Sequence, residues 1–396
     1  MTRTSIIGEL RDTIYDDSDL EPTVALVLER MARNLSPQPY LPKSEAEIQP
    51  ALERYLAAQK VHAEVMNVAR LGGGGSKEQF VFDLRRSGIG VTRHVLRIDP
   101  AQSPIETNRR REFEILRAMK GVVPVPDVQW LDAEGSVFGQ PAIIMSFIQG
   151  VTKPVGKPTG NVSGLGIVFG DALRKKIADQ VLDQLVAIHA MDWRSADIPS
   201  FQAPIADRYQ AARWHVNWWS RVWRLDRVQP MPLMALVERW LVDNVPACED
   251  PVVVHGDYRS GNFIFDNTTS RVTAILDWEL AHLGDYHQDL AYLLLSPLGT
   301  RENGVSYATG LFEYDWFIRE YSERSGRVID PVTLHFYKIL NCYMSVVIAL
   351  GSCVRSARDS QSHQDTHLTW VAAVGHVLHT EMCNLIEKGP DNEPVS

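Results

Sequence analysis

The hydrophobic period of the chain changes near residue 150, and this change restricts the fold more than any other feature. Before it, apolar and polar residues alternate in several stretches, as in half-buried β-strands. The predicted strands cover residues 62–70, 79–86, 91–98, 127–131 and 142–147. One helix, at about 104–119, is predicted between the third and fourth strands. The first part of the chain should therefore form a small mixed sheet with one helix.

The rest of the chain is mostly helical in its spacing of apolar residues. The predicted helices cover residues 170–190, 205–224, 231–244, 286–296, 311–325, 332–356 and 366–387. One short β region, at 251–276, interrupts them. Residues 150–166 are rich in Gly, Pro, Thr and Ser and are predicted to form a loop.

Two further helices, at 18–35 and 45–59, precede the sheet, and Ser44 and Glu47 fit a capping box at the start of the second. A chain of 396 residues exceeds the usual size of one hydrophobic core, so more than one unit is expected. The predicted units are an N-terminal helical extension (1–60), a sheet lobe (61–149) and a helical lobe (150–396).

The composition excludes several classes of partner. A net charge of −9 is unfavourable for binding nucleic acid, whose phosphates attract clustered Lys and Arg. The longest apolar run, Tyr343 to Val354, is too short to span a bilayer and predicts a buried helix. The charged N-terminus lacks the apolar centre of a signal peptide, and the four cysteines form no C-x-x-C pair. We therefore expect a cytoplasmic protein without a membrane or nucleic-acid partner, whose oligomeric state the sequence does not indicate.

The segment from Pro251 to Glu279 contains the residues best suited to chemistry. A buried strand leads into His255-Gly256-Asp257, Asn262 follows five positions after Asp257, and Asp277 lies at the exit of a predicted hairpin. Phosphoryl transfer needs a carboxylate beside the acceptor hydroxyl, and oxygen ligands for Mg²⁺. Asp257, Asn262 and Asp277 have these chemical types. The alternative is a hydrogen-bonded polar turn beside a hairpin.

The sequences HGDYRSGN, ILDWE and GDYHQDLAYLL resemble the aminoglycoside phosphotransferase-like family, most closely its kinase domains associated with acyl-CoA dehydrogenases. The resemblance covers residues 60–300 and implies a protein-kinase-like α+β fold with a small sheet N-lobe and a large helical C-lobe. It also implies ATP and Mg²⁺ as cofactors. The same resemblance implies that Asp257 is the catalytic base and that Asn262 and Asp277 are catalytic metal ligands. It also implies that His255 supports the loop, and that Asp285 and Asp289 brace it and start the next helix. For Asp289, an ordinary carboxylate at a helix N-terminus is an equally good interpretation.

A run of small residues between the first two strands is predicted to contact phosphate, because glycines let backbone N–H groups approach it closely. The run consists of Gly73, Gly74, Gly75 and Ser76. The alternative is a flexible turn. The backbone of the segment from Ser146 to Ile148, after the last strand, is predicted to contact adenine as the hinge between the lobes.

The third strand should carry the cation that binds the α- and β-phosphates. Arg97 occupies that position, where kinases usually have Lys, and its planar fork suits phosphate. Glu112 is the predicted ion-pair partner, with Glu106 and Glu114 as rivals. Lys77, beside the glycines, is the rival cation.

Less specific features concern the acceptor pocket. The tryptophans Trp214, Trp218, Trp219 and Trp223 are predicted to pack in the core, with a wall of the acceptor pocket as the alternative. His189 is predicted to be a core histidine. The C-terminal helices should form an apolar wall of the pocket, with Arg355 and Arg358 as candidates that would favour an anionic acceptor.

The predicted function is ATP- and Mg²⁺-dependent phosphorylation of a hydroxyl on a small molecule, such as a hydroxyacyl compound. Two alternatives remain open. One is an antibiotic kinase acting on aminoglycosides, and the other is a nucleotide-binding pseudokinase or interaction module.

Overall fold

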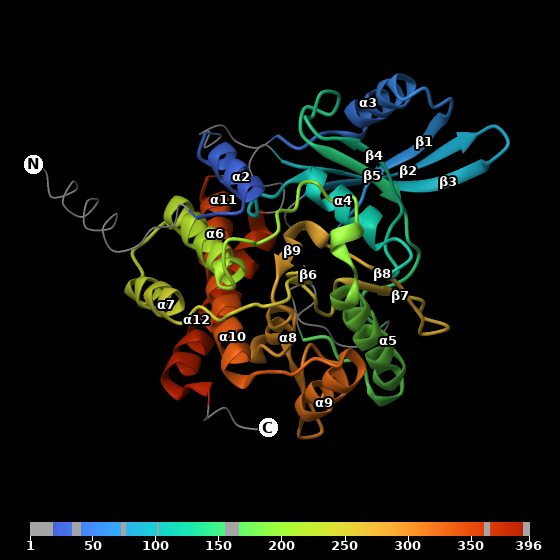
Figure 1. Ribbon diagram of the computed structural model, residues 1–396. Helices are drawn as coiled ribbons and strands as arrows, with labels where there is room; N and C mark the ends of the chain where they lie inside the picture. The colour runs from blue at the N-terminus through green and yellow to red at the C-terminus, as the bar shows by residue number, and fades with distance from the viewer. Residues whose placement is uncertain are drawn as a thin grey trace, which may run out of the picture.

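The computed structural model describes residues 19–33, 41–72, 77–100, 103–154, 166–359 and 365–390. Figure 1 shows a sheet lobe and a larger helical lobe, which confirms the predicted α+β architecture. The N-lobe sheet has the strand order β1-β2-β3-β5-β4. Its strands are β1 (Glu64–Arg70), β2 (Glu78–Arg86), β3 (Gly90–Ile98), β4 (Val128–Asp132) and β5 (Ala142–Ser146). All four pairings are antiparallel, so the prediction of a sheet mixed in direction is wrong. A tight turn joins β2 to β3, and β4 leads to β5 without the crossover helix that parallel neighbours need.

The two faces of this sheet enter different hydrophobic cores. On β3, Leu96 packs beneath helix α3 (Glu45–Ala58), whereas Val95 faces α4 (Arg109–Met119) and the C-lobe. The period of two places Arg97 on the same face as Val95, toward the space between the lobes. The predicted capping box of Ser44 and Glu47 is present at the start of α3. A further helix, α2 (Pro22–Arg33), lies against the C-lobe (Figure 1).

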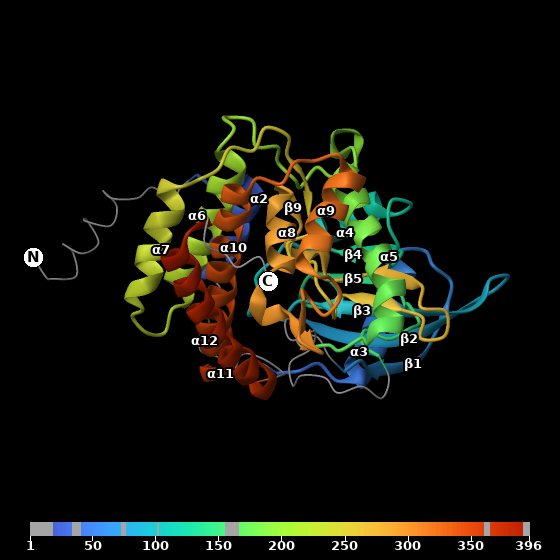
Figure 2. The same ribbon diagram turned by 90° about the horizontal axis from the view of Figure 1, so that it is seen from below.

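The C-lobe is built around long helices. They are α5 (Asp171–Ala190), α6 (Gln210–Asp226), α7 (Pro232–Asp243), α8 (His287–Leu293), α9 (Tyr314–Ser325), α10 (Pro331–Val346), α11 (Val354–Arg358) and α12 (Asp365–Lys388). Short strands connect them: β6 (Val252–Val254), β7 (Phe263–Phe265), β8 (Val272–Ile275), β9 (His282–Gly284), β10 (Thr300–Glu302) and β11 (Val305–Tyr307). Single 3₁₀ turns occur at Trp193–Ser195, Trp278–Leu280 and Ser296–Leu298. Figure 2 shows α10 and α12 side by side.

Several predicted boundaries shift. The helix expected from residue 104 begins at Arg109, because the Asn108 side chain accepts hydrogen bonds from the first turn. Strands β9, β10 and β11 were not predicted, since three residues are too few to display a period. Residues 155–165 of the predicted loop lie outside the described part of the chain.

Helix α10 continues through a π-helical stretch, Val347–Cys353, into α11. By length and composition, the helix from Pro331 to Arg358 could cross a membrane. However, 83% of its most apolar window is buried inside the protein. It is therefore a core helix, as the sequence predicts for its apolar centre.

Candidate active site

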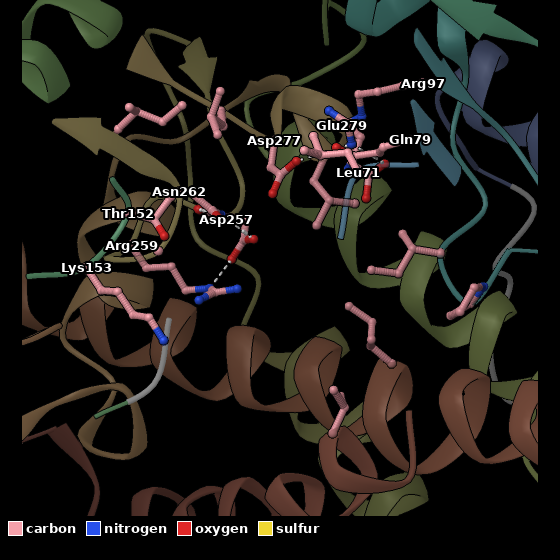
Figure 3. Close-up of a pocket in the computed structure, with 18 of the residues that line it drawn as sticks. Leu71, Gln79, Arg97, Thr152, Lys153, Asp257, Arg259, Asn262, Asp277 and Glu279 are labelled. Atoms are coloured by element: carbon pink, nitrogen blue, oxygen red, sulfur yellow. Dashed lines mark hydrogen bonds and ion pairs between the residues drawn. The ribbon is translucent and has the colours of Figure 1, made fainter. Parts of the chain in front are cut away.

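A cavity of about 970 Å³ lies between the sheet and the helical lobe. Figure 3 shows Arg97 and Gln79, from the sheet, on one side of it, and Asn262 and Arg259 on the other. Asp257 and Asp277 both line the cavity. The structure thus brings the predicted base, the predicted metal ligands and the predicted phosphate clamp to one site.

Asp257 is held by its own loop. Its Oδ1 accepts a hydrogen bond from Arg259 Nε at 2.9 Å, and its Oδ2 accepts one from Asn262 Nδ2 at 2.6 Å. Tyr292 lines the cavity beside them, and burial together with the charge of Asp257 raises the pKa of its hydroxyl. The two hydrogen bonds fix the orientation of the carboxylate and leave each oxygen a lone pair for a further donor.

His255 supports the loop from beneath, as the resemblance implies. Its Nδ1 accepts from the backbone N–H of Asp257 at 3.2 Å, and its Nε2 lies 3.0 Å from the carbonyl of Leu276. A backbone N–H can only donate and a carbonyl can only accept, so the ring is the neutral tautomer protonated on Nε2. Burial lowers the pKa of His255, which agrees with this neutral state. The ring therefore joins the loop of Asp257 to the residue before Asp277.

Asp289 also braces this loop. Its carboxylate accepts from the backbone N–H groups of His255 at 2.8 Å and Gly256 at 2.9 Å. His189 Nε2 lies 3.2 Å from the carboxylate of Asp289, and His189 Nδ1 lies 2.7 Å from the hydroxyl of Tyr321. Both ring nitrogens of His189 therefore have partners, as predicted for a core histidine. Burial alone would raise the pKa of Asp289, but these hydrogen bonds and neighbouring histidines hold it below its usual range.

Asp285 starts the next helix, as the resemblance implies, but among the described residues its side-chain hydrogen bonds go to that helix and not to the loop. Its Oδ1 accepts from the backbone N–H of His287 at 2.9 Å and lies 2.6 Å from His287 Nδ1. A carboxylate this close to the helix start satisfies the first turn of α8 instead.

Asp277 stands at the exit of β8 with a left-handed backbone, φ 60°. Such a conformation is uncommon outside glycine and occurs preferentially at functional sites. Its Oδ1 lies 3.2 Å from Arg97 Nη2, and 42% of its side chain is exposed. The backbone N–H of Leu276 donates to the carbonyl of Asn262 at 2.8 Å, which ties the two predicted metal ligands together.

Arg97 and Glu112 form the predicted ion pair, at 2.7 Å. The rivals have other partners: Glu106 contacts Arg30, and Glu114 accepts from Ser200. Whether Arg97 binds phosphate stays a prediction.

A buried cluster of charges surrounds this pair. Lys77 and Arg109 both contact Asp99, and Arg109 also contacts Glu112. Burial alone would raise the pKa of Asp99, but Arg109 and Lys77 hold it below its usual range. Lys77 is 1% exposed, donates to the carbonyl of Ile105 at 3.1 Å and is not among the described residues that line the cavity. The rival clamp is thus a structural cation of the N-lobe.

The predicted hinge belongs to the described residues, whereas the predicted nucleotide loop does not. Gly73, Gly74, Gly75 and Ser76 lie outside the described residues. In the hinge, Ser146 and Ile148 both line the cavity. The backbone N–H of Ser146 donates to the backbone carbonyl of Asp127 at 2.8 Å. The carbonyl of Ser146 and the N–H of Ile148 are therefore the candidates to contact the edge of adenine.

Apolar side chains from the C-terminal helices form the opposite wall of the cavity. They are Met344, Ile348, Ala349, Cys353, Leu368, Val371, Val374 and Leu378. Three of them, Ile348, Ala349 and Cys353, belong to the π-helical stretch, a feature that often occurs at functional sites. The predicted apolar wall is thus present.

The expectation that Arg355 and Arg358 belong to this wall is wrong. Arg355 is buried against Asp226, with Nε 2.7 Å from the carboxylate, and Arg358 pairs with Asp359 on the surface. An arginine needs such a partner when it leaves water, and Asp226 on α6 lies behind the wall rather than in the cavity. The tryptophans of α6 do not line the cavity among the described residues, and three of them, Trp218, Trp219 and Trp223, are buried, as the core interpretation predicts.

Several polar residues of the cavity were not predicted from the sequence, among them Arg259, Glu279, Tyr292 and Lys153. Arg259 lies between Asp257 and Asn262 in the chain, so its proximity to the site was available as a signal. Burial alone would lower the pKa of Arg259, but the neighbouring Asp257 raises it, so the guanidinium stays charged. Glu279 lies within 3.9 Å of Arg97 and 3.7 Å of Lys77.

The architecture and this arrangement of residues define a protein-kinase-like phosphotransferase fold. A family model described as phosphotransferase enzyme family matches residues 67–324, well over half of the chain. The chain therefore belongs to this phosphotransferase family, as its motifs predict.

Curated relatives include acyl-CoA dehydrogenase family member 11 of Rattus norvegicus, 26% identical over 83% of this chain and 42% of that protein. Family member 10 of Mus musculus is 29% identical over 62% of this chain and 23% of that protein. The chain thus spans less than half the length of these relatives. An aminoglycoside 3′-phosphotransferase of Streptomyces fradiae is 33% identical over 24% of this chain and 33% of that protein.

Solved structures share the fold. A candidate aminoglycoside phosphotransferase from Ralstonia eutropha has a TM-score of 0.62 at 23% identity, covering 86% of this chain and 98% of its own. An aminoglycoside phosphotransferase in complex with ADP and hygromycin B has a TM-score of 0.54 at 15% identity, covering 83% and 97%. At these identities the likeness establishes the fold alone.

Proposed function

We propose that this chain transfers the γ-phosphate of ATP to a hydroxyl of a small molecule, with Asp257 as catalytic base. The observation that carries the proposal is the meeting of Asp257, Asp277 and Arg97 around one cavity that also contains the hinge. Phosphoryl transfer depends mainly on positioning and on neutralising charge, and this cavity supplies fixed groups for both.

The residues present fit a Mg²⁺ ion. Asn262 Nδ2 donates to Asp257, so its amide oxygen is left for another partner. With the partly exposed carboxylate of Asp277, this gives two oxygen donors, the ligand type that Mg²⁺ prefers together with water and phosphate oxygens. Asn262 and Asp277 would hold the ion, which would supply charge neutralisation at the phosphates.

The protein's own groups have separate roles in this proposal. Asp257 accepts the proton of the acceptor hydroxyl as that oxygen bonds to phosphorus. Arg259, charged and 2.9 Å from Asp257, orients the carboxylate and faces the transferred group. Arg97 neutralises the nucleotide phosphates while Glu112 fixes its direction.

The acceptor is proposed to be a free small molecule. Protein kinases present peptides on a long segment after the metal-binding Asp. Here a 3₁₀ turn and β9 follow Asp277 directly, and β9 pairs with β6. The apolar wall supports an acceptor with aliphatic surface, and the names of the acyl-CoA dehydrogenase relatives support a hydroxyacyl compound.

An aminoglycoside is the second candidate, supported by the partial match to the enzyme of Streptomyces fradiae. Aminoglycosides are polycations and need an acidic pocket. Among the described residues, the acidic groups of the cavity are Asp257, Asp277 and Glu279, and all three contact arginines. The cavity therefore favours the apolar acceptor. A pseudokinase has no chemical need for Asp257, Asn262 and Asp277 together.

The test is release of ADP from γ-labelled ATP, or of GDP from γ-labelled GTP, with 3- and 4-hydroxyacyl compounds, aminoglycosides and a protein extract as acceptors. Asp257→Asn serves as the blank, because it should keep MgATP binding and lose most of kcat, on the order of a thousandfold. Turnover chiefly on aminoglycosides would favour the second candidate, and label chiefly in protein would refute the small-molecule acceptor. Nucleotide binding without turnover on any acceptor would indicate a pseudokinase.

A further inference from the structure

The residues just before α2 connect with both lobes. Asp19 is anchored to the C-lobe helix α6, where its Oδ2 lies 2.6 Å from Arg213 Nε and its Oδ1 accepts from Trp214 Nε1 at 2.6 Å. Two residues later, Glu21 turns toward the N-lobe helix α4 and lies 2.6 Å from Arg111 Nη1. The chain therefore reaches from one lobe to the other within three residues.

Arg111 carries this connection to the active site. Its Nη2 donates to the carbonyl of Ala281 at 3.0 Å, in the segment that follows Asp277. Its guanidinium lies over the ring of Phe201, 4.2 Å from the centroid. The side chains of Glu21 and Arg111 are 7% and 8% exposed. In such surroundings a charge is stable only with its partner, so the pair defines the position of α4.

Arg111 directly precedes Glu112, the residue that pairs with Arg97. We propose that Glu21 and Arg111 are positioning residues, which hold α4 and the segment after Asp277 so that Glu112 engages Arg97. This role rests on the proposed function of Arg97 as phosphate clamp. The N-terminal extension would then contribute to nucleotide binding, although it lies far in the sequence from the motifs of the active site.

Independent contacts point the same way. Arg30 on α2 donates to the carbonyl of Thr107, next to the cap of α4, at 2.8 Å. Glu114 on α4 accepts from Ser200, whose carbonyl accepts from Thr23 Oγ1 at 2.8 Å. Thus α4 is fixed to the extension at its start and in its first turns, on the face away from the sheet.

The test uses Glu21→Gln, which removes the charge but keeps an acceptor for the Gln202 backbone N–H, now 3.0 Å away. Glu29→Gln is the matched control, because Glu29 is an exposed carboxylate of the same extension that pairs with Arg33 within α2. Hydrogen–deuterium exchange of residues 109–119 and 281–284 is measured without substrate, and KM for ATP and kcat are measured separately. We expect faster exchange in both segments and a rise in KM for ATP of about tenfold in Glu21→Gln, with a smaller change in kcat.

Arg111→Met should reproduce these changes, and Arg111→Lys should restore part of the wild-type KM. Unchanged exchange in α4 and unchanged KM in Glu21→Gln would overturn the proposal, as would the same changes in Glu29→Gln. If the wild-type chain neither binds nor turns over nucleotide, the proposed function fails, and local exchange alone still decides whether Glu21 positions α4.

Discussion

The two halves of the cavity are built on different physical principles. Beneath the sheet, the lining groups are charges fixed by other charges, as in the contacts of Arg97 with Glu112 and Asp277. Against the C-terminal helices, the lining is a continuous apolar surface from the π-helical stretch and α12. Charged groups held in place before the reaction act strongly on a developing charge, whereas apolar surface discriminates by shape and area.

The comparison implies that the polar half determines whether transfer occurs, and the apolar half determines on which molecule. A change in the polar half should alter rate or nucleotide binding by orders of magnitude. A change in the apolar half should alter acceptor preference by smaller factors. The following variants test this division, beginning with the largest expected effect.

Asp277→Ala should reduce turnover by about a thousandfold and weaken MgATP binding, because the proposed direct metal carboxylate is lost. Calorimetric titration with ATP, with and without Mg²⁺, together with kcat, measures both effects. Asp266→Asn, in the turn between β7 and β8, is the control outside the cavity. Unchanged ATP affinity in the presence of Mg²⁺ would argue against the metal role.

Arg259→Lys should reduce kcat by about a hundredfold and leave the Kd of MgATP unchanged, since a point charge cannot reproduce the guanidinium contact with Asp257. Single-turnover kinetics separates the chemical step from product release. The exposed Arg271→Lys, in the nearby hairpin, should behave as wild type. A wild-type rate in Arg259→Lys would mean that the guanidinium is only a structural partner of the loop.

Arg97→Lys should raise KM for ATP by about tenfold, and Arg97→Ala by more, because Lys restores the charge without the planar fork. Steady-state kinetics with varied ATP measures this. Lys77→Met should instead lower the free energy of unfolding, since the buried Asp99 would lose a neutralising partner. A raised KM for ATP in Lys77→Met but not in the Arg97 variants would mean that the phosphate-binding cation is Lys77, beside the glycine loop.

Ala349→Met should lower kcat/KM for a bulky acceptor by about tenfold without changing KM for ATP, because added side-chain volume in an apolar pocket is worth one to a few kcal/mol. Measuring kcat/KM for two acceptors of different length tests this expectation. Val377→Met on α12 is the control, since Val377 is 55% exposed and does not line the cavity. Equal effects on ATP and acceptor would show that the two halves are not independent.

The chemical types and the spacing of the site were readable in the sequence. Asp257, Asn262 and Asp277 lie in one stretch with strong local signals, and the period of β3 placed Arg97 on the inner face. Such assignments succeed because strand periodicity and loop motifs depend on neighbours in the chain. The family and the two-lobed fold followed from the same residues.

Long-range contacts were not readable. Nothing near Arg355 in the sequence indicates that Asp226, 129 positions away, would bury it, so its predicted place in the pocket was wrong. Likewise, the left-handed backbone of Asp277 depends on how β8 meets the turn that follows it.

The sequence by itself indicated which groups are candidates for phosphate chemistry, because short loop motifs and the period of a strand specify those groups. Only the tertiary structure decided which charges pair in the interior, where Lys77 is directed, and how Glu21 reaches Arg111. The physical reason is that a buried charge is stable only beside its opposite, and the fold, rather than the local sequence, selects that partner.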